Sequence, residues 1–419
     1  MLEALITQMG AGGDGVASLP DGASAFIAFT LPGERVTARP APKDRAALLS
    51  VDAPSADRVE APCRHFTVCG GCSLQHWADA PYGEWKRQRL VEALSRAGYP
   101  DASVAPMVTT PRQVRQRADL GLERLADGRV EIGFHERGAT NLVPMRECHV
   151  LLPALVALLP GLQDALRGLN ALKRLGSAVI NMLDSGPDIL LRTDAPLSMP
   201  DRRMLAEYAA RAGIPRIAWE GKGGPAEVAA QIRPVRHSLS GITVSPPPGA
   251  FLQASAPGEA AIIAAVMAGL PARMSPRARV ADLYAGIGTL SFPLAQHVLV
   301  QAYEGDAASA EALRQAAHTG QVSRLLAERR DLVRQPLLPA ELKHFAAVVL
   351  DPPFAGAAEQ VAQIARSTLA RVIYVSCSPA ALGRDAAVLR GAGFDVLAAT
   401  PVDQFLWSPH LESVVVFGR

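Results

Sequence analysis

The feature that most constrains this chain is the regular alternation of apolar and helical segments from about residue 250 onward. Apolar stretches at 279–283, 298–303, 346–350 and 372–375 are separated by segments of helical pattern. Strands that alternate with helices in this way are typically buried in a parallel sheet with helices on both faces. Ligands of such sheets bind beyond the carboxyl ends of the strands. We therefore expect a doubly wound, Rossmann-like domain over residues 246–419.

The first 55 residues have a different pattern, with short strand-like stretches separated by glycine-rich turns. This pattern predicts a five-stranded barrel of the OB type over 1–55, a fold often used to bind single-stranded RNA. A small barrel that serves only as a spacer would look the same. Residues 56–245 mix both kinds of element, including a predicted helix at 82–98, and indicate an α+β domain. The chain as a whole is thus expected to be a multidomain α/β protein.

In the central part, Arg115 and Arg117 alternate within a strand-like stretch, so we expect them on one strand face. Such a face suits contact with RNA, although a solvated charged face is the commoner explanation. The formal net charge of +2 neither requires nor excludes a nucleic-acid partner. No apolar run reaches the ~18 residues of a membrane span, and no signal peptide is recognisable. We expect a cytoplasmic monomer.

A glycine turn follows the first strand of the Rossmann-like domain. Gly286 and Gly288 form a G-x-G motif, and Glu304 ends the next strand, where an acid can bind ribose hydroxyls. Asp282 precedes the turn, and Ser291 stands where a dinucleotide fold usually has its third glycine. These features favour S-adenosylmethionine over NAD, with an ordinary turn that binds no cofactor as the alternative. Asp331, after the predicted third strand, could bind the adenine amino group.

Two segments beyond the cofactor loop carry reactive side chains. Cys377 lies in an S-C-S-P turn directly after the strand 372–375, and Glu412 lies just before the last apolar stretch. Carbon 5 of uracil is a poor nucleophile, but a thiolate that adds to carbon 6 makes it enolate-like. A base must then remove the proton of carbon 5 before the thiol can leave. A cysteine and a carboxylate beside a methyl donor therefore suit methylation of uracil at carbon 5.

A competing motif lies at 351–354, where Asp351 and two prolines are followed by Phe354. This D-P-P-aromatic sequence is similar to that of enzymes that methylate exocyclic amino groups, in which the aromatic ring stacks on a flipped base. Such enzymes need no cysteine nucleophile. A third hypothesis is a non-enzymatic RNA-binding or redox-sensing protein, which would bind no S-adenosylmethionine.

The other four cysteines form a separate set, in which three lie close together and one is distant. They are Cys63, Cys69, Cys72 and Cys148. Four thiolates suit either a structural zinc ion or an iron–sulfur cluster. Zinc sites more often pair two C-x2-C motifs, so this spacing favours a [4Fe–4S] cluster, while nearby histidines keep a mixed zinc site open.

Taken together, these residues resemble the bacterial 5-methyluridine RNA methyltransferase family, in particular its branch with a TRAM domain and a [4Fe–4S] cluster that acts on 23S ribosomal RNA. The resemblance implies that 1–55 is the TRAM barrel, that 246–419 is a class I methyltransferase domain, and that 23S rRNA is favoured over tRNA as partner. It assigns Cys377 as nucleophile and Glu412 as base. The implied cofactor residues are Gln253, Asp282, Tyr284, Gly286, Gly288, Glu304, Asp331 and Asp351, and the cluster ligands are Cys63, Cys69, Cys72 and Cys148.

The chain departs from the pattern of this family at four positions, one of which is Pro409 before His410. Ser378 follows the nucleophile where the family usually has Asn. The stretch 251–253 is similar to the F-x-Q motif of the family, and Ser255 stands where that motif usually ends in Asn. Phe354 replaces the Arg of D-P-P-R. None of these changes removes the nucleophile or the base, so the expected reaction class is unaffected.

Overall fold

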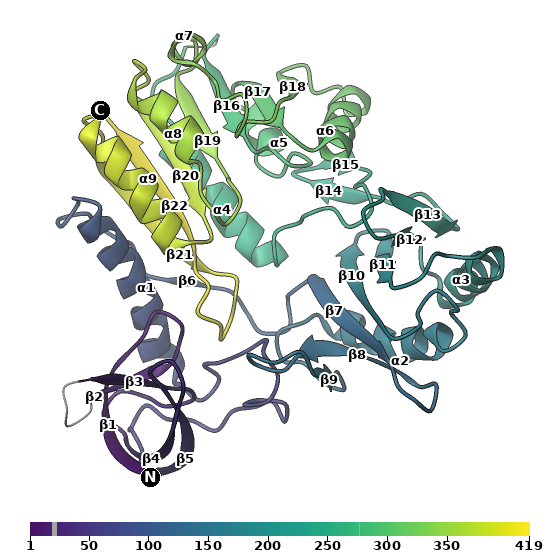
Figure 1. The fold of residues 1–419 in the computed structure, drawn as a ribbon. Helices are drawn as coiled ribbons and strands as arrows, with labels where there is room; N and C mark the ends of the chain where they lie inside the picture. Colours follow the sequence, from purple (N-terminus) through teal and green to yellow (C-terminus); the bar gives the residue numbers. More distant parts are fainter. Residues whose placement is uncertain (19–22, 276) are drawn as a thin grey trace.

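The computed structural model describes residues 1–18, 23–275 and 277–419 (Figure 1). Within these residues the chain forms a closed barrel, a seven-stranded sheet, a short hairpin and an eight-stranded sheet. The predicted multidomain α/β organisation is therefore found. No helix in the described part of the chain combines the length and the apolar character that a membrane crossing requires.

The barrel is built from the first strands of the chain. In the described residues its strands are β1 (Leu2–Met9), β2 (Gly15–Ser18), β3 (Ser24–Ile27), β4 (Arg35–Ala41) and β5 (Arg45–Ala53). Their order is β1-β2-β3-β5-β4, and pairing of β4 with β1 closes the barrel. Alternate side chains point inward, so that Ile6, Ile27 and Val36 fill a small apolar core.

The central sheet has the order β13-β12-β11-β10-β7-β8-β9. Its strands are β7 (Arg117–Arg124), β8 (Val130–His135), β9 (Leu142–Pro144), β10 (Leu175–Leu183), β11 (Gly186–Thr193), β12 (Arg216–Glu220) and β13 (Ala226–Gln231). Helices α2 (Pro153–Leu166) and α3 (Met199–Ala212) pack their leucines on it. The hairpin of β14 (His237–Leu239) and β15 (Ile242–Val244) leads to the C-terminal domain and contacts one of its helices.

The predicted placement of Arg115 and Arg117 on one strand face is wrong. Strand β7 begins only at Arg117, and Arg115 lies before it, where it forms bridges with Leu151 and Ser255. The Arg115 side chain lines a cavity described below, whereas the Arg117 guanidinium lies over the ring of Phe251 at 5.7 Å. Bridging to two distant segments, which the local alternation does not reveal, holds Arg115 out of the strand.

The C-terminal sheet has the order β18-β17-β16-β19-β20-β22-β21-β6. Its strands are β6 (Val108–Thr109), β16 (Arg279–Leu283), β17 (Leu299–Glu304), β18 (Leu325–Arg329), β19 (Ala347–Leu350), β20 (Arg371–Ser376), β21 (Asp395–Asp403) and β22 (Glu412–Gly418). The four strands predicted in this region are confirmed to within two residues. The five strands β16 to β20 are parallel to one another, and β22 is antiparallel to β20.

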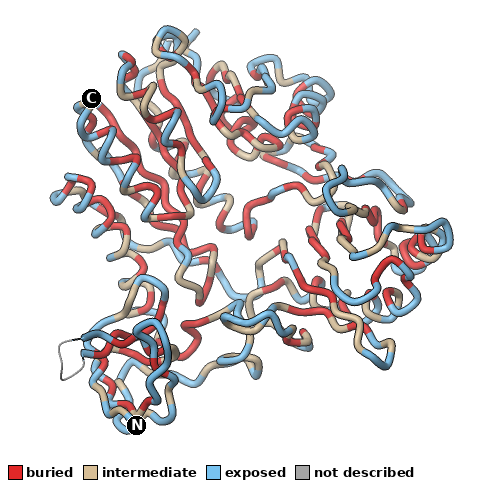
Figure 2. The backbone as a smooth tube through the Cα atoms, in the orientation of Figure 1, coloured by how far each residue is buried: buried red, intermediate tan, exposed pale blue. Residues whose placement is uncertain are grey.

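Helices cover both faces of this sheet, as Figure 1 shows. One layer contains α4 (Ala256–Gly269), α5 (Ser291–Ala295) and α6 (Ala307–Thr319), and the other contains α1 (Asp79–Arg96), α7 (Pro339–Leu342), α8 (Ala358–Ala365) and α9 (Pro379–Gly391). The predicted helix at 82–98 is α1, which packs on α9 and β21. The sheet strands between the layers are almost wholly buried in Figure 2. The carboxyl ends of the strands are thereby left as the accessible edge.

Candidate active site

The glycine turn after β16 has a backbone that only particular residues can adopt. Tyr284, Gly286 and Gly288 all have positive φ, at 63°, 57° and 106°. A Cβ on Gly288 would lie 2.5 Å from the ring of Phe292 and 2.6 Å from Leu313, so a larger residue cannot fit without displacing buried side chains. The turn therefore holds the backbone between β16 and α5 in a shape that a ligand can approach closely.

Buried polar atoms line this turn. Ser291, at the position of the missing third glycine, donates a hydrogen bond from Oγ to Asp282 Oδ2 at 2.5 Å. Burial raises the pKa of Asp282 to about 7, although Ser291 opposes the shift. Asp282 Oδ1 and the hydroxyl of Tyr284 are buried without a partner in the described residues. Unpartnered buried polar atoms are costly, so a turn that carries two of them fits a polar ligand such as S-adenosylmethionine.

The two other predicted acids at the cofactor site differ in how they lie. Glu304, at the end of β17, accepts hydrogen bonds from the backbone N–H of Gly286 and of Asp306, both at 2.7 Å. It therefore sits directly against the glycine turn. Asp331 follows β18, is exposed, and accepts from backbone N–H groups of its own turn. The structure thus brings Glu304 to the turn and leaves Asp331 at its margin.

The register of two antiparallel strands brings the predicted nucleophile and base together. Ser376 at the end of β20 pairs with Ser413 in β22. Cys377 follows that pair on one strand and Glu412 precedes it on the other, so both lie at the same edge of the sheet. Ser378 then caps α9 by accepting a hydrogen bond from the N–H of Ala381.

Acidic groups dominate the electrostatics of this edge. Burial raises the pKa of Glu412 to about 8, with Asp351 adding to the rise and a hydrogen bond from Gln404 opposing it. Burial likewise raises the pKa of Asp351 to about 7, against a hydrogen bond from Gln253. The pKa of the Cys377 thiol rises to about 12, first through burial and then through Glu412 and Asp351. Burial and the two acids thus favour the neutral form of the thiol.

Two glutamine amides connect the carboxyl groups. Gln253 donates from Nε2 to Asp351 Oδ2 at 3.2 Å. Gln404 donates from Nε2 to Gln253 Oε1 at 2.8 Å and to Glu412 Oε2 at 2.7 Å, and its own Oε1 accepts from the N–H of Ala254 at 3.1 Å. Gln253 was predicted from a motif, whereas Gln404 was missed because no motif marks it. Its only sequence signal is its position after β21, in the loop that ends at Glu412.

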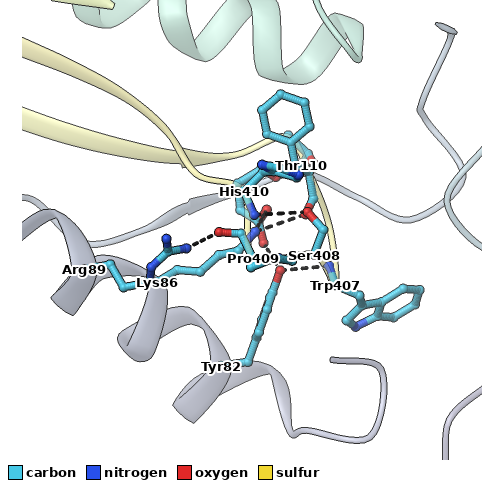
Figure 3. A network of polar contacts seen from close by, with 10 residues as sticks. Tyr82, Lys86, Arg89, Thr110, Trp407, Ser408, Pro409 and His410 are labelled. Atoms are coloured by element: carbon cyan, nitrogen blue, oxygen red, sulfur yellow. Dashed lines mark hydrogen bonds and ion pairs between the residues drawn. The ribbon is translucent and has the colours of Figure 1, made fainter. Parts of the chain in front are cut away.

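The loop from Asp403 to Glu412 is held by α1, as Figure 3 shows for part of the network. Lys86 donates from Nζ to Asp403 Oδ1 at 2.5 Å, and both side chains are fully buried. The Tyr82 hydroxyl donates to Asp403 Oδ2 at 2.7 Å and accepts from the N–H of Trp407 at 2.8 Å. Arg89, one turn further along, donates to the carbonyl of Pro409. Helix spacing places all three donors on one face of α1.

A cavity of about 510 Å³ joins the five cysteines of the chain. Its wall includes Cys63, Cys69, Cys72, Cys148 and Cys377. The thiols are free, and burial raises the pKa of Cys69, Cys72 and Cys148. In the described residues no group of His, Cys, Asp or Glu side chains has the geometry to hold a metal ion. The four cysteines that the sequence predicts as ligands therefore line one cavity. As they stand, their sulfur atoms are not close enough together to hold a single metal ion.

The residues of the competing D-P-P motif lie in the same place. Phe354 is 61% exposed, lines the cavity together with Cys377, and meets His410 edge-on at 6.3 Å between ring centroids. Geometry alone therefore allows an aromatic ring to stack on a base here in either reaction class.

Comparison with known proteins separates these classes. The family described as tRNA (Uracil-5-)-methyltransferase matches residues 274–419. The 23S rRNA (uracil(1939)-C(5))-methyltransferase RlmD of Halomonas elongata is 34% identical, over 99% of this chain and 89% of its own length. The chain belongs to the RNA uracil-C5 methyltransferase family. An uncharacterized RNA methyltransferase of Brucella suis is 39% identical over 99% of this chain and 97% of its own length.

A solved structure supports the fold of this family member over its full length. The tRNA (uracil-54, C5)-methyltransferase of Pyrococcus abyssi, in complex with S-adenosyl-L-homocysteine, superposes with a TM-score of 0.72 over 99% of this chain and 100% of that chain, at 20% identity. The family assignment confirms the predicted class of RNA uracil-C5 methyltransferase. The roles of the individual site residues stay predictions.

Proposed function

We propose that this family member transfers a methyl group from S-adenosylmethionine to carbon 5 of a uridine in RNA, with Cys377 as nucleophile and Glu412 as base. The observation that carries this assignment is the strand register, because Ser376 and Ser413 pair directly and leave the thiol and the carboxyl group at one edge. Oε1 of Glu412 is buried and has no hydrogen-bond partner among the described residues, which suits an oxygen that takes up a proton.

In the proposed reaction, the Cys377 thiolate adds to carbon 6 of uracil and the electron pair moves to carbon 5, which takes the methyl group. Glu412 then removes the proton of carbon 5, the carbon 5–carbon 6 double bond forms again, and the bond from carbon 6 to sulfur breaks. S-adenosylmethionine supplies the methyl group and a positive sulfonium charge, which favours a thiolate beside it. The target uridine must leave the base stack to reach this edge.

The residues proposed to hold the cofactor surround the glycine turn. Asp282, Tyr284, Gly286 and Gly288 form the turn itself, Glu304 would bind the ribose, and Asp331 the adenine amino group. Gln253 and Asp351 lie between the turn and Glu412, so they would contact both cofactor and uracil.

We further propose that Cys63, Cys69, Cys72 and Cys148 hold a [4Fe–4S] cluster with a structural role. A tetrahedral zinc site with bonds of about 2.3 Å would need four closely packed sulfurs, whereas a cluster binds each thiolate through a different iron and accepts wider spacing. Anaerobically purified protein should contain about four irons and four sulfides per chain, and Cys72→Ser should lose them. One zinc and no sulfide per chain would contradict this proposal.

The favoured RNA is 23S rRNA, with tRNA as the second candidate. The support is the full-length likeness to a relative named for uracil 1939 of 23S rRNA, together with an N-terminal barrel of a type that binds single-stranded RNA. Fragments of each RNA that contain 5-fluorouridine test target and mechanism together.

Fluorine at carbon 5 cannot be removed by a base, so the enzyme should stay attached to the RNA after methyl transfer. An SDS-resistant protein–RNA band with one fragment, absent in Cys377→Ala, would support the mechanism and identify the RNA. Methylation of natural RNA by Cys377→Ala would contradict it and favour the amino-group reaction at Asp351 and Phe354.

A further inference from the structure

We propose that Gln404 is a positioning residue for the second half of the reaction, holding one oxygen of Glu412 so that the other removes the carbon 5 proton. This inference rests on the proposed function, because it takes Glu412 as the base. It assigns a role to a residue outside the motifs that define the nucleophile, the cofactor loop and the base.

Both the nitrogen and the oxygen of the Gln404 amide have hydrogen-bond partners. Its Nε2 donates to Glu412 Oε2 at 2.7 Å and to Gln253 Oε1 at 2.8 Å, while its Oε1 accepts from the N–H of Ala254 at 3.1 Å. The side chain is 3% exposed and that of Glu412 is 4% exposed. An amide that is buried and fully satisfied in this way has one orientation only, so it fixes Glu412 Oε2 in space.

The second oxygen of Glu412 has no such partner. Oε1 is buried and makes no hydrogen bond in the described residues. The titratable groups that face this carboxyl group are Asp351, beyond the end of β19, and Cys377, after β20. Both are acidic, so neither supplies a positive charge that could hold the carboxylate. Gln404 is thus the neutral donor that favours its ionised form.

The role follows from the bonds that change in this step. Glu412 Oε1 takes the proton from carbon 5, the electron pair of that C–H bond forms the carbon 5–carbon 6 double bond, and the pair of the C–S bond returns to Cys377. Only a carboxylate whose free oxygen faces carbon 5 can do this. Without Gln404, the carboxyl group could rotate, and its pKa, already about 8, would rise further.

The test separates addition from release in Gln404→Met, a substitution that keeps length and volume. With 5-fluorouridine RNA, the variant should form the covalent adduct at the wild-type rate, since that reaction stops before proton removal. With natural RNA, release of methylated product should be about tenfold slower or more, because a hydrogen bond to a charged group is lost. Methylated adduct should accumulate, and the acid limb of the release rate should move to higher pH.

Gln360→Met is the matched control. Gln360 is also fully buried and makes two hydrogen bonds, to the N–H and the carbonyl of Leu337, so neither bond involves Glu412 or Gln253. The proposal would be overturned if Gln404→Met released product at a rate within about twofold of that of Gln360→Met and with the same acid limb. Gln404→Glu provides a second, isosteric variant if the first folds poorly. It places a carboxyl group beside Glu412 and should shift the acid limb further in the same direction.

Failure of the proposed function and failure of the Gln404 role give different experimental results. If wild-type protein forms no adduct with any 5-fluorouridine RNA, the proposed function fails and the role of Gln404 fails with it. If wild-type protein forms the adduct and Gln404→Met loses it as well, Gln404 acts before proton removal, and the positioning role is wrong while the proposed function stands.

Discussion

Removal of Lys86 should loosen the loop that carries the proposed base. The Lys86 ammonium and the Asp403 carboxylate form a fully buried pair at 2.5 Å, and Lys86 also donates to the carbonyl of Phe405 at 3.0 Å. In Lys86→Met, the Tyr82 hydroxyl is the one side-chain donor that still reaches the Asp403 carboxylate among the described residues. Breaking a buried pair from one side costs about 3–5 kcal/mol, because an uncompensated charge stays behind.

Hydrogen exchange of the amides at 403–412 measures this cost locally, which suits a chain of several domains without a single unfolding transition. A loss of about 3–5 kcal/mol should speed exchange in this loop by about two to four orders of magnitude. The barrel amides serve as an internal reference. Lys86→Met combined with Asp403→Leu should recover much of the protection, since an apolar pair of similar volume leaves no charge behind. Unchanged exchange in Lys86→Met would refute the claim that this pair holds the loop.

Three other changes test the site. Glu412→Gln should lower the pKa of the Cys377 thiol, since the ionised carboxylate raises it, so the alkylation rate of the thiol should rise at lower pH than in the wild type. Gly288→Ala forces a Cβ against Phe292 at a φ of 106°; calorimetry should show weakened binding of S-adenosylmethionine and a stability loss of about 1–3 kcal/mol. In thermal unfolding, Ser378→Ala should cost about 1 kcal/mol through loss of the helix cap, whereas Ser378→Asn should stay near the wild type.

The sequence predicted the C-terminal sheet well because its strands are buried on both faces. Each is then a continuous apolar run followed by a helix, and this pattern is visible without knowledge of neighbours. The glycine turn was equally visible, since positive φ and close approach restrict the residue type at Gly286 and Gly288. Features that depend on a single local segment, such as these strands and this turn, could therefore be predicted.

The contacts between segments could not be predicted. Lys86 is one of several basic residues in an amphipathic helix, and nothing in its surroundings shows that it pairs with a carboxylate 317 residues away. Gln404 likewise has no distinguishing feature in the sequence. Its partners, Gln253 and Glu412, become its neighbours only when separate segments pack together in the fold. Arg115 shows the opposite error, because its alternation with Arg117 resembled a strand while distant partners held it out of one. Contacts between residues far apart in the chain produce no local periodicity in the sequence, so they cannot be predicted from it.

The structure explains what the departures from the family pattern do locally. Ser378 and Ser255 both replace an expected Asn, and both are N-caps whose hydroxyl accepts a backbone N–H, of α9 and α4 respectively. Since Ser and Asn cap helices about equally well, these two changes preserve the local structure around Cys377 and Gln253. Phe354 is different in kind, because it replaces a cation with an exposed ring in the wall of the cavity beside Cys377. A ring offers a stacking face where a guanidinium offers charge and hydrogen bonds, so Phe354 is the departure that changes what this site can contact in RNA.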